Sequence, residues 1–165
     1  MPPRYRVLAV KIPFFYTAYA QRRAGIPPTV PLAVLHHQRV VELSPAALLA
    51  LSGGEASSLG WGFAGDGDML GLSCRALRHR VPELRFIPYD EAFYAGAATP
   101  IYEVCAAFSP LVAPLAPHLI LVDLTGAGPE PERAGQLLEA IRATCGLQPA
   151  GGLAGNCWLA RSAAA

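Results

Sequence analysis

Short apolar runs alternate with polar, glycine-rich or proline-rich breaks along the whole chain. The run 5–12 carries the apolar bulk of a first strand, which Pro13 ends. The segment 130–144 repeats apolar residues at helical spacing, and Gly146 follows it as a stop signal. Read in this way, the sequence predicts strands at 5–12, 31–36, 39–43, 84–88, 119–124 and 148–154, and helices at 14–23, 45–51, 68–79, 89–108, 130–144 and 156–165.

Capping and turn residues set the expected boundaries of these elements. Ser44 followed by Pro45 is a typical helix start, with a capping hydroxyl before a proline at the first helical position. We expect Asp68 to cap the helix that runs to about residue 79, and Pro100 to lie in an N-terminal turn of the helix at 89–108. The segment 52–67 is rich in Gly and Ser and predicts a loop.

The order of these elements predicts an α+β fold, with a mixed or antiparallel sheet and helices on one face. The strands at the two ends of the chain enclose a smaller unit. We therefore expect one palm-like domain formed by residues 1–24 and 76–165, with a fingers-like insertion at 25–75. At 165 residues, of which 53% are hydrophobic, the chain can build a sizeable core.

Charge is sparse and balanced, and this limits the classes of partner. The net charge is +1, and Lys11 is the only lysine among thirteen basic residues. Non-specific binding of nucleic acid depends on clustered Lys and Arg, so composition gives DNA binding only weak support. No apolar run reaches the length of a membrane span, and the N-terminus lacks the pattern of a secretory signal. We expect a soluble cytoplasmic protein.

Candidate metal ligands are scattered. The cysteines form no C-x-x-C pair, so we expect them to be reduced and buried; they are Cys74, Cys105, Cys145 and Cys157. Cys74 and His79 alone do not make a four-ligand zinc site. The pair His36-His37 lies at a predicted hairpin turn, where exposure is the simpler expectation. The segment 65–68 (Gly-Asp-Gly-Asp) lacks the remaining oxygen ligands of a calcium loop.

Six segments, in order and at compatible spacing, resemble the palm and fingers of Y-family (translesion) DNA polymerases. The match covers nearly the whole chain, and no motif is specific alone. The segments are Val10-Lys-Ile-Pro-Phe-Phe-Tyr16 for the first palm strand and its aromatic turn, 39–48 for the fingers strand and following helix, 69–84 for the helix before a Pro-x-Leu turn, 89–110 for the long palm helix, 121–126 for the second palm strand, and 152–161 for the Gly-x-x-x-Asn-x-x-Leu-Ala segment.

The resemblance implies that the catalytic acids are missing. Polymerases use two divalent metal ions, and Mg²⁺ prefers carboxylate oxygens. In the family, acids occupy the first-strand positions that Lys11 and Pro13 hold here, and the second-strand positions that His118 and Leu119 hold here. A lysine ammonium repels a divalent cation, and a leucine cannot ligate one. We therefore expect no metal site and no cofactor.

The side chains that would hold the triphosphate are missing as well. The family's tyrosine and arginine in the fingers fall at Pro45 and Leu48, and its lysine near the end of the palm falls at Cys157. The aromatic step, which is the run Phe14-Phe15-Tyr16, is retained. In the family, the position of Tyr16 packs against the sugar and rejects ribonucleotides; packing in the core is an equally good interpretation here.

Three charged or polar residues near these positions have simpler alternatives. Asp123 lies four residues beyond Leu119, roughly 13 Å along the strand, so we expect it to close the strand or cap the turn at Thr125. Lys11 could hold an anion such as phosphate, or could extend its ammonium into solvent from a strand end. His118 has no evident Ser or Cys beside it for nucleophilic catalysis.

The leading hypothesis is a catalytically inactive, palm-and-fingers protein similar to the ImuB type. That resemblance implies an adaptor in DNA-damage tolerance, translesion synthesis and the SOS response, with a polymerase, the sliding clamp and a RecA-like protein as partners. One alternative is an active metal-dependent polymerase or nucleotidyl transferase with misaligned acids. Another is an unrelated α+β interaction domain. We also expect an exposed hydrophobic surface.

Overall fold

The computed structural model describes residues 6–53 and 73–164, and these divide into two compact units. Unit 1 comprises Met1–Pro13 and Ala92–Ala165, and unit 2 comprises Phe14–Glu91. Helix α1 and strand β4 therefore belong to unit 2, whereas the predicted palm-like domain includes both of their segments. The domain boundaries at 24/25 and 75/76 stay a prediction.

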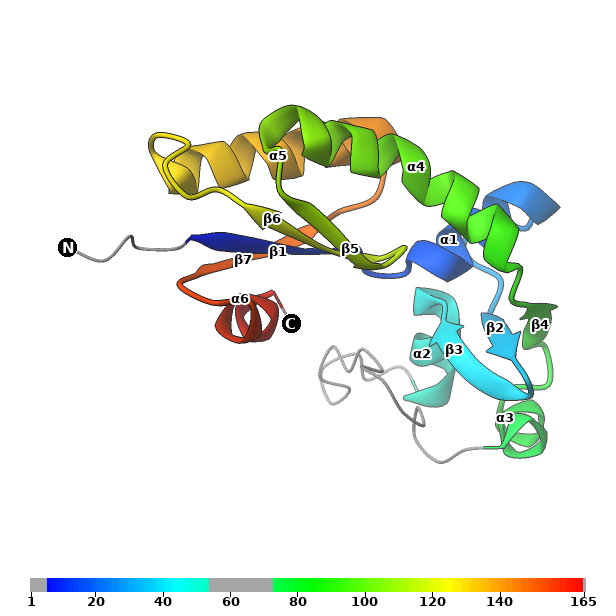
Figure 1. The fold of residues 1–165 in the computed structure, drawn as a ribbon. Coiled ribbons are helices and arrows are strands. Elements are labelled where there is room, and N and C mark those ends of the chain that lie inside the picture. The colour runs from blue at the N-terminus through cyan, green and yellow to red at the C-terminus, as the bar shows by residue number, and fades with distance from the viewer. Residues whose placement is uncertain (1–5, 54–72, 165) are drawn as a thin grey trace. The chain divides into compact units, whose positions relative to one another are not determined.

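Unit 1 is built on a four-stranded sheet in the order β5-β6-β1-β7, in which all neighbours are antiparallel. Figure 1 shows α4 and α5 on one face of this sheet and α6 on the other. The strands are β1 (Val7–Lys11), β5 (Val112–Ala116), β6 (Leu119–Asp123) and β7 (Ala150–Ala154), and the helices are α4 (Glu91–Phe108), α5 (Glu130–Cys145) and α6 (Cys157–Ala163).

Residues of β1 alternate between the two faces of this sheet, as strand geometry requires. Leu8 and Val10 are fully buried on the face that carries α4 and α5. Ala9 points to the other face, where it packs with Ala160 of α6 and with Ala164, the residue that follows this helix. The apolar run at the start of the chain is therefore buried on both faces, which explains why it lacks polar alternation.

Unit 2 holds a three-stranded sheet in the order β3-β2-β4. Strand β2 pairs with β3 in an antiparallel hairpin and with β4 in parallel. At the predicted turn, His37 and Gln38 both adopt left-handed backbone conformations, with φ of 49° and 63°. The elements are α1 (Phe15–Ala24), β2 (Leu32–His36), β3 (Arg39–Leu43), α2 (Pro45–Leu51), α3 (Cys74–Arg80) and β4 (Arg85–Pro88). The core of this unit is formed by Ala33, Leu43, Ala47, Leu77, Val81 and Leu84.

The predicted α+β class is confirmed, and three of the local expectations are wrong. Helix α3 begins at Cys74, because Ser73 is extended and its hydroxyl caps Ala76; Asp68 lies outside the described residues. Pro100 lies inside α4, not in a turn at its start. Cys157 is exposed and Cys74 is only partly buried, whereas burial was expected for all the cysteines.

Pro100 is tolerated because the buried face of α4 continues across it. Tyr94 and Ala98 before the proline, and Ile101 and Cys105 after it, form one stripe at spacings of three and four residues. Proline inside a helix costs about 3 kcal/mol. Burial of a stripe that includes a tyrosine and an isoleucine offsets that cost.

Strand β5 was not expected from the sequence. Its segment, Val112-Ala-Pro-Leu-Ala116, contains a proline, which has no N–H to donate within a sheet. The strand lies at the edge of the sheet, pairs only with β6, and shifts register between Pro114 and Ala116. An edge position with an irregular register is where a strand can contain proline.

Candidate functional site

The strand register of unit 1 brings two of the expected acid positions side by side. Lys11 pairs with Leu119 on β6 and with Ala150 on β7. Directly paired residues of antiparallel strands have Cα atoms about 5 Å apart and point to the same face. A lysine, a leucine and an alanine therefore form one row across the sheet, on the face that carries α6.

The other two expected acid positions lie next to this row. The backbone N–H of Ile12 donates to the carbonyl of His118 at 2.8 Å, which extends the β1–β6 pairing by one residue. Pro13 follows Ile12 and is half-buried. The sequence thus identified four residues that the fold brings together, although none of them is an acid.

Electrostatics at Lys11 reflect its burial and a neighbouring cation. Burial lowers the pKa of Lys11, and the Arg161 guanidinium on α6 lowers it further. Cys157, the third expected triphosphate position, is the exposed first residue of the same helix. Within the part of the chain that the structure describes, no group of three or more His, Cys, Asp or Glu residues could hold a metal ion. The segment 65–68, which lacks the remaining ligands of a calcium loop, lies outside that part.

Asp123 has a structural role at the opposite end of β6. It pairs with Val7, at the other end of β1 from Lys11. Its Oδ1 accepts the backbone N–H of Thr125 at 2.8 Å, and the Thr125 hydroxyl accepts the N–H of Arg6 at 2.9 Å. The prediction that Asp123 closes the strand and caps the turn is confirmed.

The aromatic step belongs to unit 2 and is buried. Phe14 precedes α1 in the left-handed region, with φ of 57°. Phe15 is fully buried and Tyr16 is 6% exposed. The ring of Tyr16 meets those of Phe15 and Tyr89 edge-on, at centroid distances of 5.5 and 5.6 Å. This burial favours the packing interpretation of Tyr16 over contact with a nucleotide sugar.

Glu42, on β3, is a buried acid that the sequence analysis missed. Its Oε2 accepts the backbone N–H of Thr17 at 2.7 Å and the Thr17 hydroxyl at 3.0 Å. The backbone N–H groups of Tyr16 and Phe14 also interact with the carboxylate. Glu42 of β3 therefore caps the N-terminus of helix α1. Its carboxylate takes the place of the side-chain cap that Phe14 cannot supply.

Burial dominates the protonation of this acid. Only 7% of Glu42 is exposed, and burial raises the pKa of its carboxyl to about 7, although the hydrogen bonds from Thr17, Tyr16 and Phe14 oppose the rise. The protonated carboxyl can also be hydrogen-bonded, because its O–H can donate to the Thr17 hydroxyl. That hydroxyl can then donate to the Phe14 carbonyl at 3.3 Å. Near neutral pH, the cap is therefore partly protonated.

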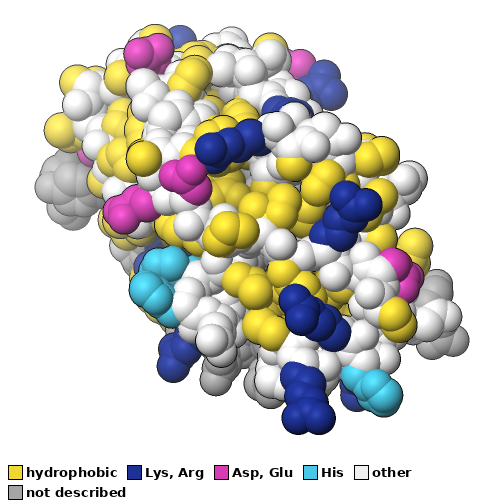
Figure 2. All heavy atoms as spheres, turned by 90° about the vertical axis from the view of Figure 1, so that its right-hand side faces the viewer, with side chains coloured by type: hydrophobic (Ala, Val, Ile, Leu, Met, Phe, Trp, Pro, Cys, Tyr) yellow, Lys and Arg dark blue, Asp and Glu magenta, His cyan; other side chains and the backbone are white. Residues whose placement is uncertain are grey.

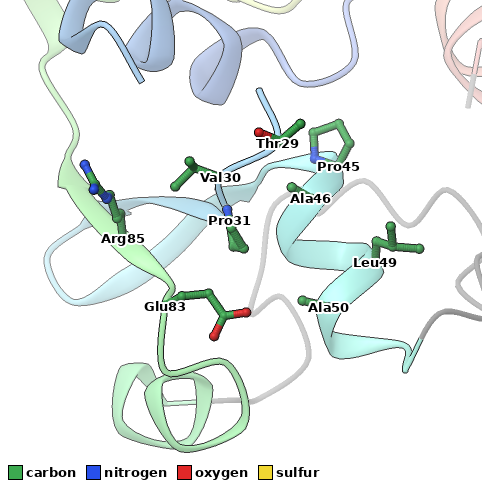
Figure 3. Close-up of a pocket in the computed structure, with 9 residues that line it drawn as sticks. All are labelled: Thr29, Val30, Pro31, Pro45, Ala46, Leu49, Ala50, Glu83 and Arg85. Carbon is green, nitrogen blue, oxygen red and sulfur yellow. The ribbon is translucent and has the colours of Figure 1, made fainter. Parts of the chain in front are cut away.

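The two expected triphosphate positions in the fingers lie on α2. Pro45 is exposed and lines an open groove of about 850 Å³, and Leu48 packs against the core of unit 2. Figure 3 shows the groove between α2 and the segment that leads into β4, with Glu83 and Arg85 on the β4 side. The α2 side of the groove is formed by Pro45, Ala46, Leu49 and Ala50, so it presents no hydroxyl or guanidinium to a phosphate.

The described surface carries dispersed charge. Figure 2 shows Lys and Arg side chains separated by hydrophobic ones on the face in view, and the described side chains of that face form no continuous basic surface. Large apolar side chains are exposed in unit 1, on α6 and at β5. They are Leu111, Leu115, Trp158 and Leu159, with exposed fractions from 49% to 74%. None of the helices in the described ranges is both long and apolar enough to cross a membrane.

Comparisons with known proteins identify the fold. No protein-family model and no curated protein matches the sequence. Solved structures of Y-family DNA polymerases do match: a Dbh ternary complex at 16% identity with a TM-score of 0.75, and DinB from Sulfolobus solfataricus at 15% identity with a TM-score of 0.73. A Y-family chimera of Dbh and Dpo4 matches at 15% identity with a TM-score of 0.74.

The matches cover 96% of this chain but only 44–45% of those polymerase chains. At these identities, the similarity shows the fold and no more. The palm-like fold predicted from the sequence is confirmed: the chain has the architecture of the corresponding part of a Y-family polymerase, and the row formed by Lys11, Leu119 and Ala150 lies on its sheet.

Proposed function

We propose that this chain is a non-catalytic Y-family polymerase-like protein that acts in DNA-damage tolerance as an adaptor or accessory factor, similar to the ImuB type. The observation that carries the proposal is the pairing of Lys11 with Leu119 on one sheet face of a Y-family fold. An ammonium beside an aliphatic side chain repels Mg²⁺ and offers it no oxygen ligand. The position of the metal ions in a polymerase would thus hold a cation of the protein itself.

The exposed side chains support a role in protein contacts. Trp158 is 74% exposed on α6, and Leu111 is 64% exposed beside β5. Aromatic residues are enriched in protein–protein interfaces. A polymerase, a sliding clamp and a RecA-like protein are the partner classes that the resemblance implies. The structural neighbours extend the proposal to DNA, since they are DNA polymerases and one of them is described as a ternary complex. Cytoplasmic localisation stays a prediction.

Restoring carboxylates at the paired positions should create a metal site. The Lys11→Asp/Leu119→Asp double variant places two carboxylates about 5 Å apart at the Cα level, so we expect it to bind Mn²⁺ at least about tenfold more tightly than the wild type. Titration with Mn²⁺, followed by electron paramagnetic resonance, measures this. The Lys11→Ala/Leu119→Ala variant is the control, because it removes the ammonium without adding a ligand.

Primer extension tests the missing activity directly. We expect the wild-type chain to add no nucleotide to a primer–template with Mg²⁺ or Mn²⁺. Magnesium-dependent extension that survives Lys11→Ala would contradict the proposal and favour an enzyme whose acids lie elsewhere. The chain matches less than half the length of its polymerase neighbours, so a lack of extension could reflect missing polymerase parts as well as missing metal ligands. The Mn²⁺ titration tests the metal ligands alone.

A further inference from the structure

Two cations share the face of the unit 1 sheet that carries α6. Lys11 lies two residues after Ala9 on β1, so both side chains point to the same face. Ala9 packs with Ala160 of α6, and Arg161 is the next residue of that helix. The packing of α6 on β1 therefore brings the guanidinium to the side of the sheet from which the ammonium projects.

The close approach of α6 fixes this arrangement. A Cβ atom at Gly152, the β7 partner of Ala9, would lie 2.1 Å from the Ala160 carbonyl oxygen. The helix backbone therefore rests directly on the strand. Because Arg161 belongs to the segment that is seated in this way, its position relative to Lys11 is set by backbone packing and not by a long surface loop.

Among the described residues, Lys11 and Arg161 place two positive charges on this part of the sheet face. Arg161 acts on Lys11 as a like charge and lowers its pKa, so the two cations repel each other across the face. Leu119 and Ala150, the register neighbours of Lys11, add no charge to the row. A phosphate that accepts hydrogen bonds from both groups would convert this repulsion into attraction, since a guanidinium offers a planar fork and an ammonium a compact charge.

We propose that Lys11 and Arg161 form a phosphate-binding site that holds the phosphate directly, without a divalent metal between phosphate and protein. The proposal rests on the proposed function, because it assigns a ligand to the face where a catalytic polymerase would hold its metal ions. The phosphate could come from a nucleic-acid backbone or from a free nucleotide. In both cases, the recognised group is a phosphate oxygen with its negative charge.

Binding to a labelled single-stranded 20-mer, measured by fluorescence anisotropy with EDTA present, tests the site. We expect Lys11→Ala and Arg161→Ala each to weaken binding by about threefold to tenfold, and to lower the slope of log affinity against log salt by about 0.7 for one lost phosphate contact. Arg142→Ala is the matched control. It removes the same charge from an exposed position on α5, where the arginine pairs with Glu139, and should change affinity less than twofold.

Competition separates the two sources of phosphate. Displacement of the 20-mer by millimolar deoxynucleoside triphosphate or inorganic phosphate, lost in Lys11→Ala, would indicate a site for free phosphate compounds; resistance to both would indicate the nucleic-acid backbone. Lys11→Arg should keep most of the affinity, because the charge remains. Thermal melting by circular dichroism checks that each variant is folded.

Several outcomes would overturn the phosphate site. They are equal effects of Lys11→Ala and Arg142→Ala, dependence of binding on a divalent metal, and an absence of binding by the wild-type chain to the 20-mer, the nucleotide and phosphate alike. The two proposals fail separately. Metal-dependent primer extension by the wild type would refute the proposed function whatever the anisotropy shows. Unchanged binding by Lys11→Ala in a chain without extension would refute only the phosphate site.

Discussion

Replacing Gly152 with alanine should displace helix α6 from the sheet and lower the free energy of unfolding by about 3 kcal/mol. The added Cβ would lie 2.1 Å from the Ala160 carbonyl oxygen and 2.5 Å from the Ala164 backbone nitrogen. Backbone atoms of a helix cannot rotate away as the end of a side chain can. The helix must therefore move as a whole, and the buried contacts of Ala160 and Ala164 with Ala9 are lost.

Urea unfolding and limited trypsin digestion measure the two parts of this effect. A displaced α6 should expose the bond after Arg161 and speed its cleavage. Gly135→Ala is the matched control, because a Cβ there meets nothing within 4 Å and the residue lies inside α5. That variant should gain about 0.5–1 kcal/mol from helix propensity. Equal stabilities of the two variants would show that α6 does not rest on Gly152 in solution.

Local signals in the sequence were enough for most of the elements. Ser44 was expected to cap α2, and its hydroxyl accepts the Ala47 N–H at 3.2 Å. His37 and Gln38 were expected at a hairpin turn and occupy it. Each of these signals depends on residues within a few positions of each other. Secondary structure of this kind depends on residues that are close in the sequence, so a single sequence suffices to predict it.

The features that escaped prediction depend on distant parts of the chain. Strand β5 contains Pro114, and its edge position beside β6 lets a proline lie in the strand. Glu42 looks like an ordinary charge in a strand, because its partner Thr17 lies 25 residues away. For the candidate site, the resemblance predicted which positions replace acids, and that assignment stays a prediction. The sequence did not show that α6 brings Arg161 to the face of Lys11, since that follows from packing on Ala9.

Glu42 should make the stability of the chain fall as pH rises from about 4.5 to 8. Its pKa in the folded chain is raised from 4.5 to about 7. A raised pKa in an acid means that folding favours the protonated form. The contribution to stability is therefore fully present below pH 4.5, where both states are protonated, and is lost as pH rises through 7 and the buried carboxyl ionises. A difference of that size corresponds to about 3 kcal/mol between the two ends of the range.

Urea unfolding at several pH values, on the wild type and on Glu42→Gln, measures this loss. The glutamine is neutral at every pH and keeps an oxygen that can accept the Thr17 N–H, so its stability should vary much less across the range. Glu139→Gln is the control. Its carboxylate is exposed, and the hydrogen bond from Arg142 lowers the pKa of Glu139, away from the range in which the buried Glu42 carboxyl titrates. The control should therefore follow the wild-type curve.

Parallel curves for the wild type and Glu42→Gln would show that three backbone N–H groups and the Thr17 hydroxyl outweigh burial and keep the carboxylate ionised. The cap of α1 would then be a fixed charge at the base of the aromatic step rather than a group that titrates near neutral pH.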